Sequence, residues 1–190
     1  MMFAPRPAII PPMASYTITQ KIHPISTRYV VTDAESGNEV CHVRKKKFRL
    51  REELVLWADE SETRPYARVK ARNVVDFGGL YEVLDEAERP VGALRRQGMQ
   101  SMLRVRWEIL DAAGTTLAMV QEDSMAMALL RRFTGLPVPI GFSFTAPDGG
   151  VVGNHKRRFG LRDVYDVHAD GIDPRLAIAQ GIALDLLEAR

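Results

Sequence analysis

The sequence has only one cysteine, Cys41, among its 190 residues, so no disulfide can form within the chain. This scarcity fits a reducing compartment, and we expect a cytoplasmic protein. Cys41 alternates with Val40 and His42 in an extended pattern, which indicates a structural or partly exposed thiol rather than a nucleophile. The first residues hold no basic region followed by a continuous apolar stretch, so they are not a secretory signal.

Motifs that carry enzymatic chemistry are also scarce. His23, His42, His155 and His168 are scattered, none has a second ligand at metal-binding spacing, and no CxxC pair occurs. The sequence has no glycine-rich phosphate loop and no pair of carboxylates placed for acid and base catalysis. We therefore expect a non-enzymatic protein without a metal ion or a cofactor.

Neither sign of charge dominates, because the net charge is only +2. With 46% hydrophobic and 26% charged residues, the chain can bury a full core as one unit. We expect a single domain over residues 15–190, preceded by a flexible proline-rich arm at residues 1–14.

What the sequence does contain is repetition. YEVLDEAERPVGALRR, at residues 81–96, and WEILDAAGTTLAMVQE, at residues 107–122, share an aromatic residue, an aliphatic residue, an Asp and a second aliphatic residue at the same spacing. Alternating apolar and polar residues predict strands, and the Asp predicts the turn between them, so each copy is a predicted β-hairpin. Further copies begin at Tyr29, Val55 and Phe142, and a last one begins at Tyr165.

The last copy ends in DPRLAIAQGIALDLLEAR, which predicts a helix with Asp173 as N-cap and Pro174 at its first position. The segment is apolar on nearly all sides, which is typical of a buried helix. It is shorter than the roughly 20 apolar residues of a membrane span and it contains Asp185, so we expect no transmembrane segment. Its predicted core residues are Leu176, Ile178, Ile182, Leu184 and Leu186.

A series of such hairpins ending in DVYDVHADGIDPRLAIAQGIALDLLE resembles the LURP-one-related family, which is grouped with the phospholipid scramblases and the tubby C-terminal domains. The residues that match the family pattern are Tyr165, Val167, Asp173, Leu176, Ala177 and Asp185. The resemblance implies a mainly β, tubby-like fold: a closed antiparallel barrel of twelve strands around a central C-terminal helix. The repeats give the same number, with one strand at residues 16–22, five hairpins and one strand at residues 161–168.

One segment lies outside the repeats. DSMAMALLRRFTG, at residues 123–135, predicts a short helix that bridges two hairpins. Its methionines can pack into the core or a lid, or they can form an adaptable docking surface, because methionine is flexible and polarizable.

Basic residues recur beyond the landmark positions of the returning strands, and we call this set the basic collar. In an up-and-down barrel every second strand runs in the same direction, so these residues are expected near one rim. One copy breaks the pattern, with Gln121 and Glu122 in the corresponding place. The collar residues are Arg44, Lys45, Lys46, Lys47, Lys70, Arg72, Arg95, Arg96, Lys156, Arg157 and Arg158.

The basic collar has two interpretations. Charged strand ends keep a protein soluble and discourage pairing between molecules. Alternatively, the collar binds an anionic ligand, since each basic residue near an anionic membrane contributes about 1 kcal/mol. The resemblance favours the second interpretation, because tubby domains bind phosphoinositides and scramblases handle membrane lipid. It implies a protein that is peripheral to the membrane.

Two other classes of function stay open. The first is a protein-interaction or structural scaffold that uses the barrel face or the methionine-rich segment. The second is nucleic-acid binding, which would need exposed aromatic side chains beside the basic residues. We rank it last, because the aromatic residues of the strand pattern are expected in the core: Tyr29, Tyr81, Trp107 and Tyr165.

Overall fold

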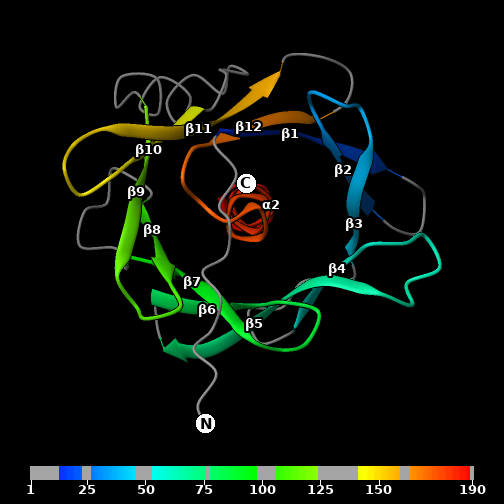
Figure 1. The fold of residues 1–190 in the computed structure, drawn as a ribbon, viewed down its shortest axis with the longest axis horizontal. Coiled ribbons are helices and arrows are strands. Elements are labelled where there is room, and N and C mark those ends of the chain that lie inside the picture. Colours follow the sequence, from blue (N-terminus) through cyan, green and yellow to red (C-terminus); the bar gives the residue numbers. More distant parts are fainter. Residues whose placement is uncertain are drawn as a thin grey trace, which may run out of the picture.

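The computed structural model describes residues 13–22, 27–45, 53–75, 78–97, 106–123, 141–158 and 163–188. Its twelve strands close into one antiparallel barrel, and a single C-terminal helix, α2 (Pro174–Glu188), lies at the centre of the barrel in Figure 1. The predicted fold class is therefore confirmed.

Consecutive strands are neighbours all the way round the barrel. The strands are β1 (Ala14–Ile22), β2 (Thr27–Asp33), β3 (Glu39–Lys45), β4 (Leu54–Trp57), β5 (Pro65–Val75), β6 (Gly78–Leu84), β7 (Pro90–Arg96), β8 (Arg106–Asp111), β9 (Thr116–Glu122), β10 (Gly141–Thr145), β11 (Val151–Arg158) and β12 (Val164–Ala169). The barrel closes where β1 pairs with β12, from Ala14 opposite Ala169 to Thr19 opposite Val164. This closure leaves the sheet without an open edge.

The repeated aspartates form the turns of the hairpins. The carboxylate of Asp85 accepts hydrogen bonds from the backbone N–H groups of Ala87 (2.9 Å) and Arg89 (2.8 Å). Asp111 does the same with Ala113 (2.9 Å) and Thr115 (2.8 Å). The repeated Asp therefore satisfies its own turn, which is the role predicted from the sequence.

The alternating strand direction gives the barrel two different rims. The tight Asp turns after β2, β4, β6, β8 and β10 lie at one end, which we call the turn rim. The odd-numbered strands finish, and the next even-numbered strands begin, at the other end, which we call the collar rim. Helix α2 starts after the turn that follows β12, so it runs from the turn rim towards the collar rim.

Helix α2 begins as the sequence predicts. Asp173 is the N-cap, because its carboxylate accepts the backbone N–H of Arg175 at 2.9 Å, and it also binds the Arg175 guanidinium at 2.9 and 2.7 Å. Pro174 occupies the first helical position, where its missing N–H costs nothing.

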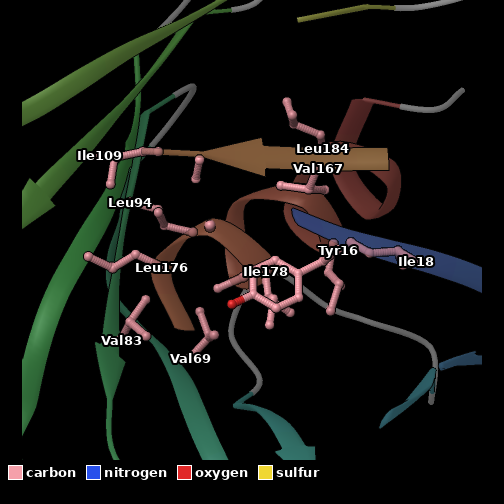
Figure 2. Close-up of a cluster of buried hydrophobic side chains, with 14 of the residues drawn as sticks. Tyr16, Ile18, Val69, Val83, Leu94, Ile109, Val167, Leu176, Ile178 and Leu184 are labelled. Atoms are coloured by element: carbon pink, nitrogen blue, oxygen red, sulfur yellow. The ribbon is translucent and has the colours of Figure 1, made fainter. Parts of the chain in front are cut away.

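The core of the protein is the space between α2 and the barrel wall. Leu176, Ile178, Ile182 and Leu184 are buried, and Leu186 is partly buried against the same cluster. Figure 2 shows Leu176, Ile178 and Leu184 of α2 among inward side chains of the strands, which include Ile18, Leu94 and Val167. The four aromatic residues assigned to the core are all buried there: Tyr29, Tyr81, Trp107 and Tyr165.

Two glycines allow close approach between the elements. A Cβ at Gly92 of β7 would lie 2.2 Å from the carbonyl oxygen of Leu110 and 3.0 Å from Leu176 Cδ1. A Cβ at Gly181 of α2 would lie 2.8 Å from Ile18 Cδ1 and 2.9 Å from Val167 Cγ2. The helix is therefore fitted against β7 near its start and against β1 and β12 further along.

Two predicted segments fall largely outside the described residues. The predicted bridging helix at residues 123–135 is described only at Asp123, and of the predicted arm at residues 1–14 only Met13 and Ala14 are described, the latter as the first residue of β1. The division into an arm and a domain stays a prediction. In the described part of the chain, no helix is long and apolar enough to cross a membrane.

Candidate functional site: the collar rim

Most described members of the basic collar lie near the collar rim, but Lys70 does not: it is the middle residue of β5, and its Nζ is 3.6 Å from Glu88 in the β6–β7 turn. The others occupy the last residues of β3, β7 and β11, and Arg72 lies in the second half of β5. Lys45 is the last residue of β3, and the structure describes its backbone only. Lys46 and Lys47 lie outside the described residues, so their part in the collar stays a prediction.

The collar residues do not all lie on the same face of their strands. Arg96 and Arg157 alternate with Leu94 and His155, whose side chains are buried inside the barrel, so both arginines are on the inward register at the rim. The other described members are on the outer face, and these are Arg44, Lys70, Arg72, Arg95, Lys156 and Arg158. The collar is therefore a set of outward cations with two inward positions.

On the β5–β8 side of the barrel, acidic neighbours neutralise the collar. Arg72 binds Glu82 with two contacts of 2.9 Å, and Arg95 binds Glu108 at 2.8 Å. Lys70 lies between Glu53 (3.8 Å) and Glu88 (3.6 Å). The Arg72 and Arg95 pairs join neighbouring strands, whereas Lys70 reaches residues outside the strands, and each pair contributes little to stability but cancels the local charge.

On β11 the balance differs. Arg158 binds both oxygens of Asp166 at 2.6 Å, and Arg157 pairs with Asp163. Lys156 is exposed and has no acidic partner among the described residues. This strand therefore presents a free cation beside a paired one on the outer face.

The cations at this rim that the sequence interpretation missed include Lys21 and Arg28. In the strand register Lys21 of β1 is opposite Arg28 of β2, and Arg28 is opposite Arg44 of β3. The three side chains face outward, because Ile18, Tyr29 and Val43 take the inward positions. We call these three residues the basic row.

The signal for the basic row was present in the sequence. Lys21 and Arg28 flank the connection between the first two strands, which lies at the same rim as the ends of the returning strands. The collar prediction considered the returning strands of the hairpins only. Strand β1 runs in the same direction as those strands, and the start of an outgoing strand lies beside their ends.

Two glutamates from one turn contact the basic row. The turn between β4 and β5 places Glu62 Oε1 2.8 Å from Arg44 Nε and Glu60 Oε1 3.3 Å from Arg28 Nη1. Lys21 is exposed and has no acidic partner in the described part of the chain.

A separate polar cluster lies inside the barrel near the collar rim. The phenol groups of Tyr29 and Tyr165 both donate hydrogen bonds to the carboxylate of Asp185 on α2. Burial, and then the nearby Asp185 carboxylate, raise the pKa of both tyrosines well above the usual range. The cluster connects α2 to β2 and β12, which makes Asp185 a structural anchor and not a solvated interruption of an apolar helix.

His155 adjoins this cluster. Its ring stacks on Tyr165 at a centroid distance of 5.1 Å, and neither ring nitrogen has a hydrogen-bond partner among the described residues. Burial lowers the pKa of His155 to about 4, against a smaller opposing effect of Asp166. The imidazole is therefore neutral at physiological pH and packs as an aromatic core residue.

Other candidates for chemistry are poorly placed. Cys41 is buried, and burial raises the pKa of its thiol well above the usual range, so the structure supports its interpretation as a structural residue. Within the described ranges, no group of three or more His, Cys, Asp or Glu side chains is arranged to hold a metal ion.

Comparison with known proteins agrees with the architecture. The family model described as LURP-one-related matches residues 55–185, from β4 into α2, which is more than half of the chain. A search of curated proteins gives no match. The end motif predicted both the family and the central helix, and both predictions are confirmed. The chain belongs to the LURP-one-related family.

Proposed function

We propose that the protein is a non-enzymatic, tubby-like module that binds an anionic ligand, of the phosphoinositide type, on the outer surface of its collar rim. One observation carries the proposal: outward cations lie on the neighbouring strands β1, β2 and β3 and, across β12 with its Asp166, on β11. We call this surface the basic face, and its cations are Lys21, Arg28, Arg44, Lys156 and Arg158.

Charge balance supports the basic face over the rest of the collar. The acidic partners on this side are Asp166, Glu60 and Glu62, whereas Lys21 and Lys156 have none among the described residues. On the opposite side of the barrel the collar cations are paired with glutamates. An anionic surface would therefore meet more unpaired positive charge on the basic face than on the β5–β8 side, where Arg106 is the exposed exception, and each engaged cation would contribute about 1 kcal/mol near the membrane.

In this proposal the protein is cytoplasmic and peripheral to the membrane. Binding requires neither a cofactor nor a metal ion. Nucleic acid ranks last as the ligand, because Tyr29, Tyr81, Trp107 and Tyr165 pack inside the barrel and are not available for stacking on bases. Scramblase-like movement of lipid would be a further activity, which a vesicle-based lipid-transfer assay would report separately from binding.

The experiment is co-sedimentation with phosphatidylcholine vesicles, with and without phosphatidylinositol 4,5-bisphosphate, at low and high salt. The test variant Lys21→Gln/Lys156→Gln removes two cations without leaving any carboxylate unpaired. The matched control Arg72→Gln/Arg95→Gln removes the same charge from the opposite side of the barrel. We expect binding that needs the anionic lipid, weakens with salt and weakens much more in the test variant than in the control. Equal binding to neutral vesicles, or none at low salt, would reject the proposal.

A second candidate, a protein-interaction scaffold, has its own observation. Met13 and Val151 are each 72% exposed, although most large apolar side chains of the described residues are covered. Both lie at the turn rim, since Met13 precedes β1 and Val151 begins β11. If vesicle binding fails, this pair is the surface to test, by changing both residues to Ser and comparing the capture of partners.

A further inference from the structure

The basic row is an energetically unfavourable arrangement within the fold. Lys21, Arg28 and Arg44 occupy directly opposed positions on three adjacent strands, where side chains are about 5 Å apart at Cβ and like charges repel. A barrel can place any polar residue at these outward positions. Three aligned cations therefore call for a counter-charge, which the strands themselves do not provide.

The turn at residues 58–64 supplies that counter-charge. Its own conformation is well defined, because the carboxylate of Asp59 accepts hydrogen bonds from the backbone N–H groups of Thr63 (3.1 Å) and Arg64 (2.6 Å). Glu62 has a φ of 57°, in the left-handed region that a residue with a side chain seldom adopts. The turn therefore fixes where Glu60 and Glu62 project, and they reach β2 and β3 from outside.

Burial on the outer face is consistent with this placement. Val30 of β2 and His42 of β3 are opposite each other on the outward register, yet both are buried, His42 completely. The ion pairs with Arg28 and Arg44 bring the β4–β5 turn to the same two strands. The turn thus lies over the outer face of β2 and β3, next to the basic row.

The two ion pairs are poor substitutes for a ligand. The Glu60 side chain is 78% exposed and its contact with Arg28 is 3.3 Å, which is a weak pair in water. Glu62 Oε1 lies 2.8 Å from Arg44 Nε without forming a hydrogen bond there, whereas a guanidinium can donate two parallel hydrogen bonds to a carboxylate or phosphate. A phosphate monoester carries up to two negative charges and three acceptor oxygens, so it can engage both arginines and Lys21 together.

We propose that the basic row is the contact site for a phosphate monoester group, and that Glu60 and Glu62 of the β4–β5 turn occupy it in the free protein and compete with that ligand. This inference rests on the proposed function and specifies its site and its built-in competitor. The phosphate can belong to a membrane phosphoinositide or to a soluble molecule, and the two sources present the same group to the row.

The test uses the full chain and two probes, inositol 1,4,5-trisphosphate followed by calorimetry and phosphatidylcholine vesicles containing phosphatidylinositol 4,5-bisphosphate followed by co-sedimentation. Arg28→Gln/Arg44→Gln should weaken binding about tenfold or more, as expected for the loss of charged hydrogen bonds. Glu60→Gln/Glu62→Gln should strengthen binding several-fold, because it removes the competitors. Unchanged thermal midpoints will show that each variant is folded.

The matched control separates competition from general charge. Glu82→Gln/Glu108→Gln makes the same change in net charge on the opposite side of the barrel, where it frees Arg72 and Arg95. We expect its affinity to stay within about twofold of the unmodified protein, because these arginines are not part of the row. If this control strengthens binding as much as Glu60→Gln/Glu62→Gln does, the gain is general electrostatics and the inference is wrong.

The remaining outcomes distinguish the two proposals. If the unmodified protein binds anionic vesicles and Arg28→Gln/Arg44→Gln binds equally well, the proposed function stands and the basic row is not its site. If the unmodified protein binds neither probe, both proposals fail. Binding to vesicles but not to the soluble trisphosphate, with loss in the arginine variant, supports the row and identifies the membrane as the source of the phosphate.

Discussion

At the scale of single residues, the buried His155 side chain makes the stability of the protein depend on pH. Its pKa is about 4 in the folded protein and near 6.5 when exposed, so the unfolded chain takes up the proton first. Above pH 6.5 the His155 side chain is neutral in both states and the free energy of unfolding keeps its full value. As the pH falls towards 4, the unfolded state binds the proton and the free energy of unfolding decreases. We expect about 2 kcal/mol less stability at pH 5 than at pH 7 from this residue, measured by urea unfolding.

The control for this prediction is His155→Phe, which keeps an aromatic ring against Tyr165 and Phe142. The variant should lose most of the difference between pH 7 and pH 5, because it has no proton to bind. If the variant loses as much stability as the unmodified protein over the same pH range, other groups are responsible.

Asp185 supports a second prediction at this scale. Asp185→Ala leaves the buried hydroxyl groups of Tyr29 and Tyr165 without their acceptor, which should lower the free energy of unfolding by about 2–4 kcal/mol. Replacing the two phenols and the carboxylate together, as Tyr29→Phe/Tyr165→Phe/Asp185→Leu, should recover much of that loss, since only the partly buried Gln20 amide, which donates to Tyr29, then loses a partner. A triple variant less stable than Asp185→Ala would contradict this account.

At the scale of the elements, the fit between β7, β8 and α2 depends on Gly92. A Cβ there would lie 2.2 Å from the backbone carbonyl of Leu110, and a backbone atom in a paired strand cannot move away cheaply. We expect Gly92→Ala to lower the free energy of unfolding by about 2–4 kcal/mol in denaturant titrations. Ala93→Val, on the half-exposed neighbouring position, should change it by less than about 0.5 kcal/mol, and similar losses for the two variants would argue against the steric explanation.

The elements also show which features the sequence could predict. The hairpins were predictable because Asp85 and Asp111 act within their own turns, so the signal is local and repeats. The start of α2 was predictable for the same reason, through Asp173 and Pro174. By contrast, the sheet pairing that aligns Lys21 with Arg28 and Arg44 depends on register between three strands, which an inspection of single hairpins does not give.

At the scale of the whole molecule, the candidate site was predicted in outline and missed in detail. The recurrence of cations on returning strands predicted the cations at the ends of β3, β7 and β11, which share one rim because strand direction alternates in a closed meander, but Lys70 lies in the middle of β5. It could not show that Glu82 and Glu108 neutralise one side, or that Glu60 and Glu62 reach the other from a turn. Such contacts depend on how neighbouring strands and turns lie in three dimensions.

The architecture itself gives the last prediction, because the barrel wall and α2 share one core. A chain that ends at Asp173 loses the buried side chains of Leu176, Ile178, Ile182 and Leu184. Each contributes about 1.5–3 kcal/mol, so their sum is comparable to the 5–15 kcal/mol that typically stabilises a domain. We expect this truncated chain to lose cooperative thermal unfolding and near-ultraviolet circular dichroism.

A truncation at the other end is the matched control. A chain that begins at Met13 keeps every described strand, and the predicted loose attachment of the arm means that its thermal midpoint should change by less than a few degrees. Adding a peptide of residues 174–190 to the C-terminally truncated chain should restore part of the cooperative transition, because the helix is joined to the wall by packing and by the Asp185 hydrogen bonds as well as by the chain. A barrel that unfolds cooperatively without α2 would show that the wall is stable on its own, and the helix would then have to be explained as an insert and not as the centre of the core.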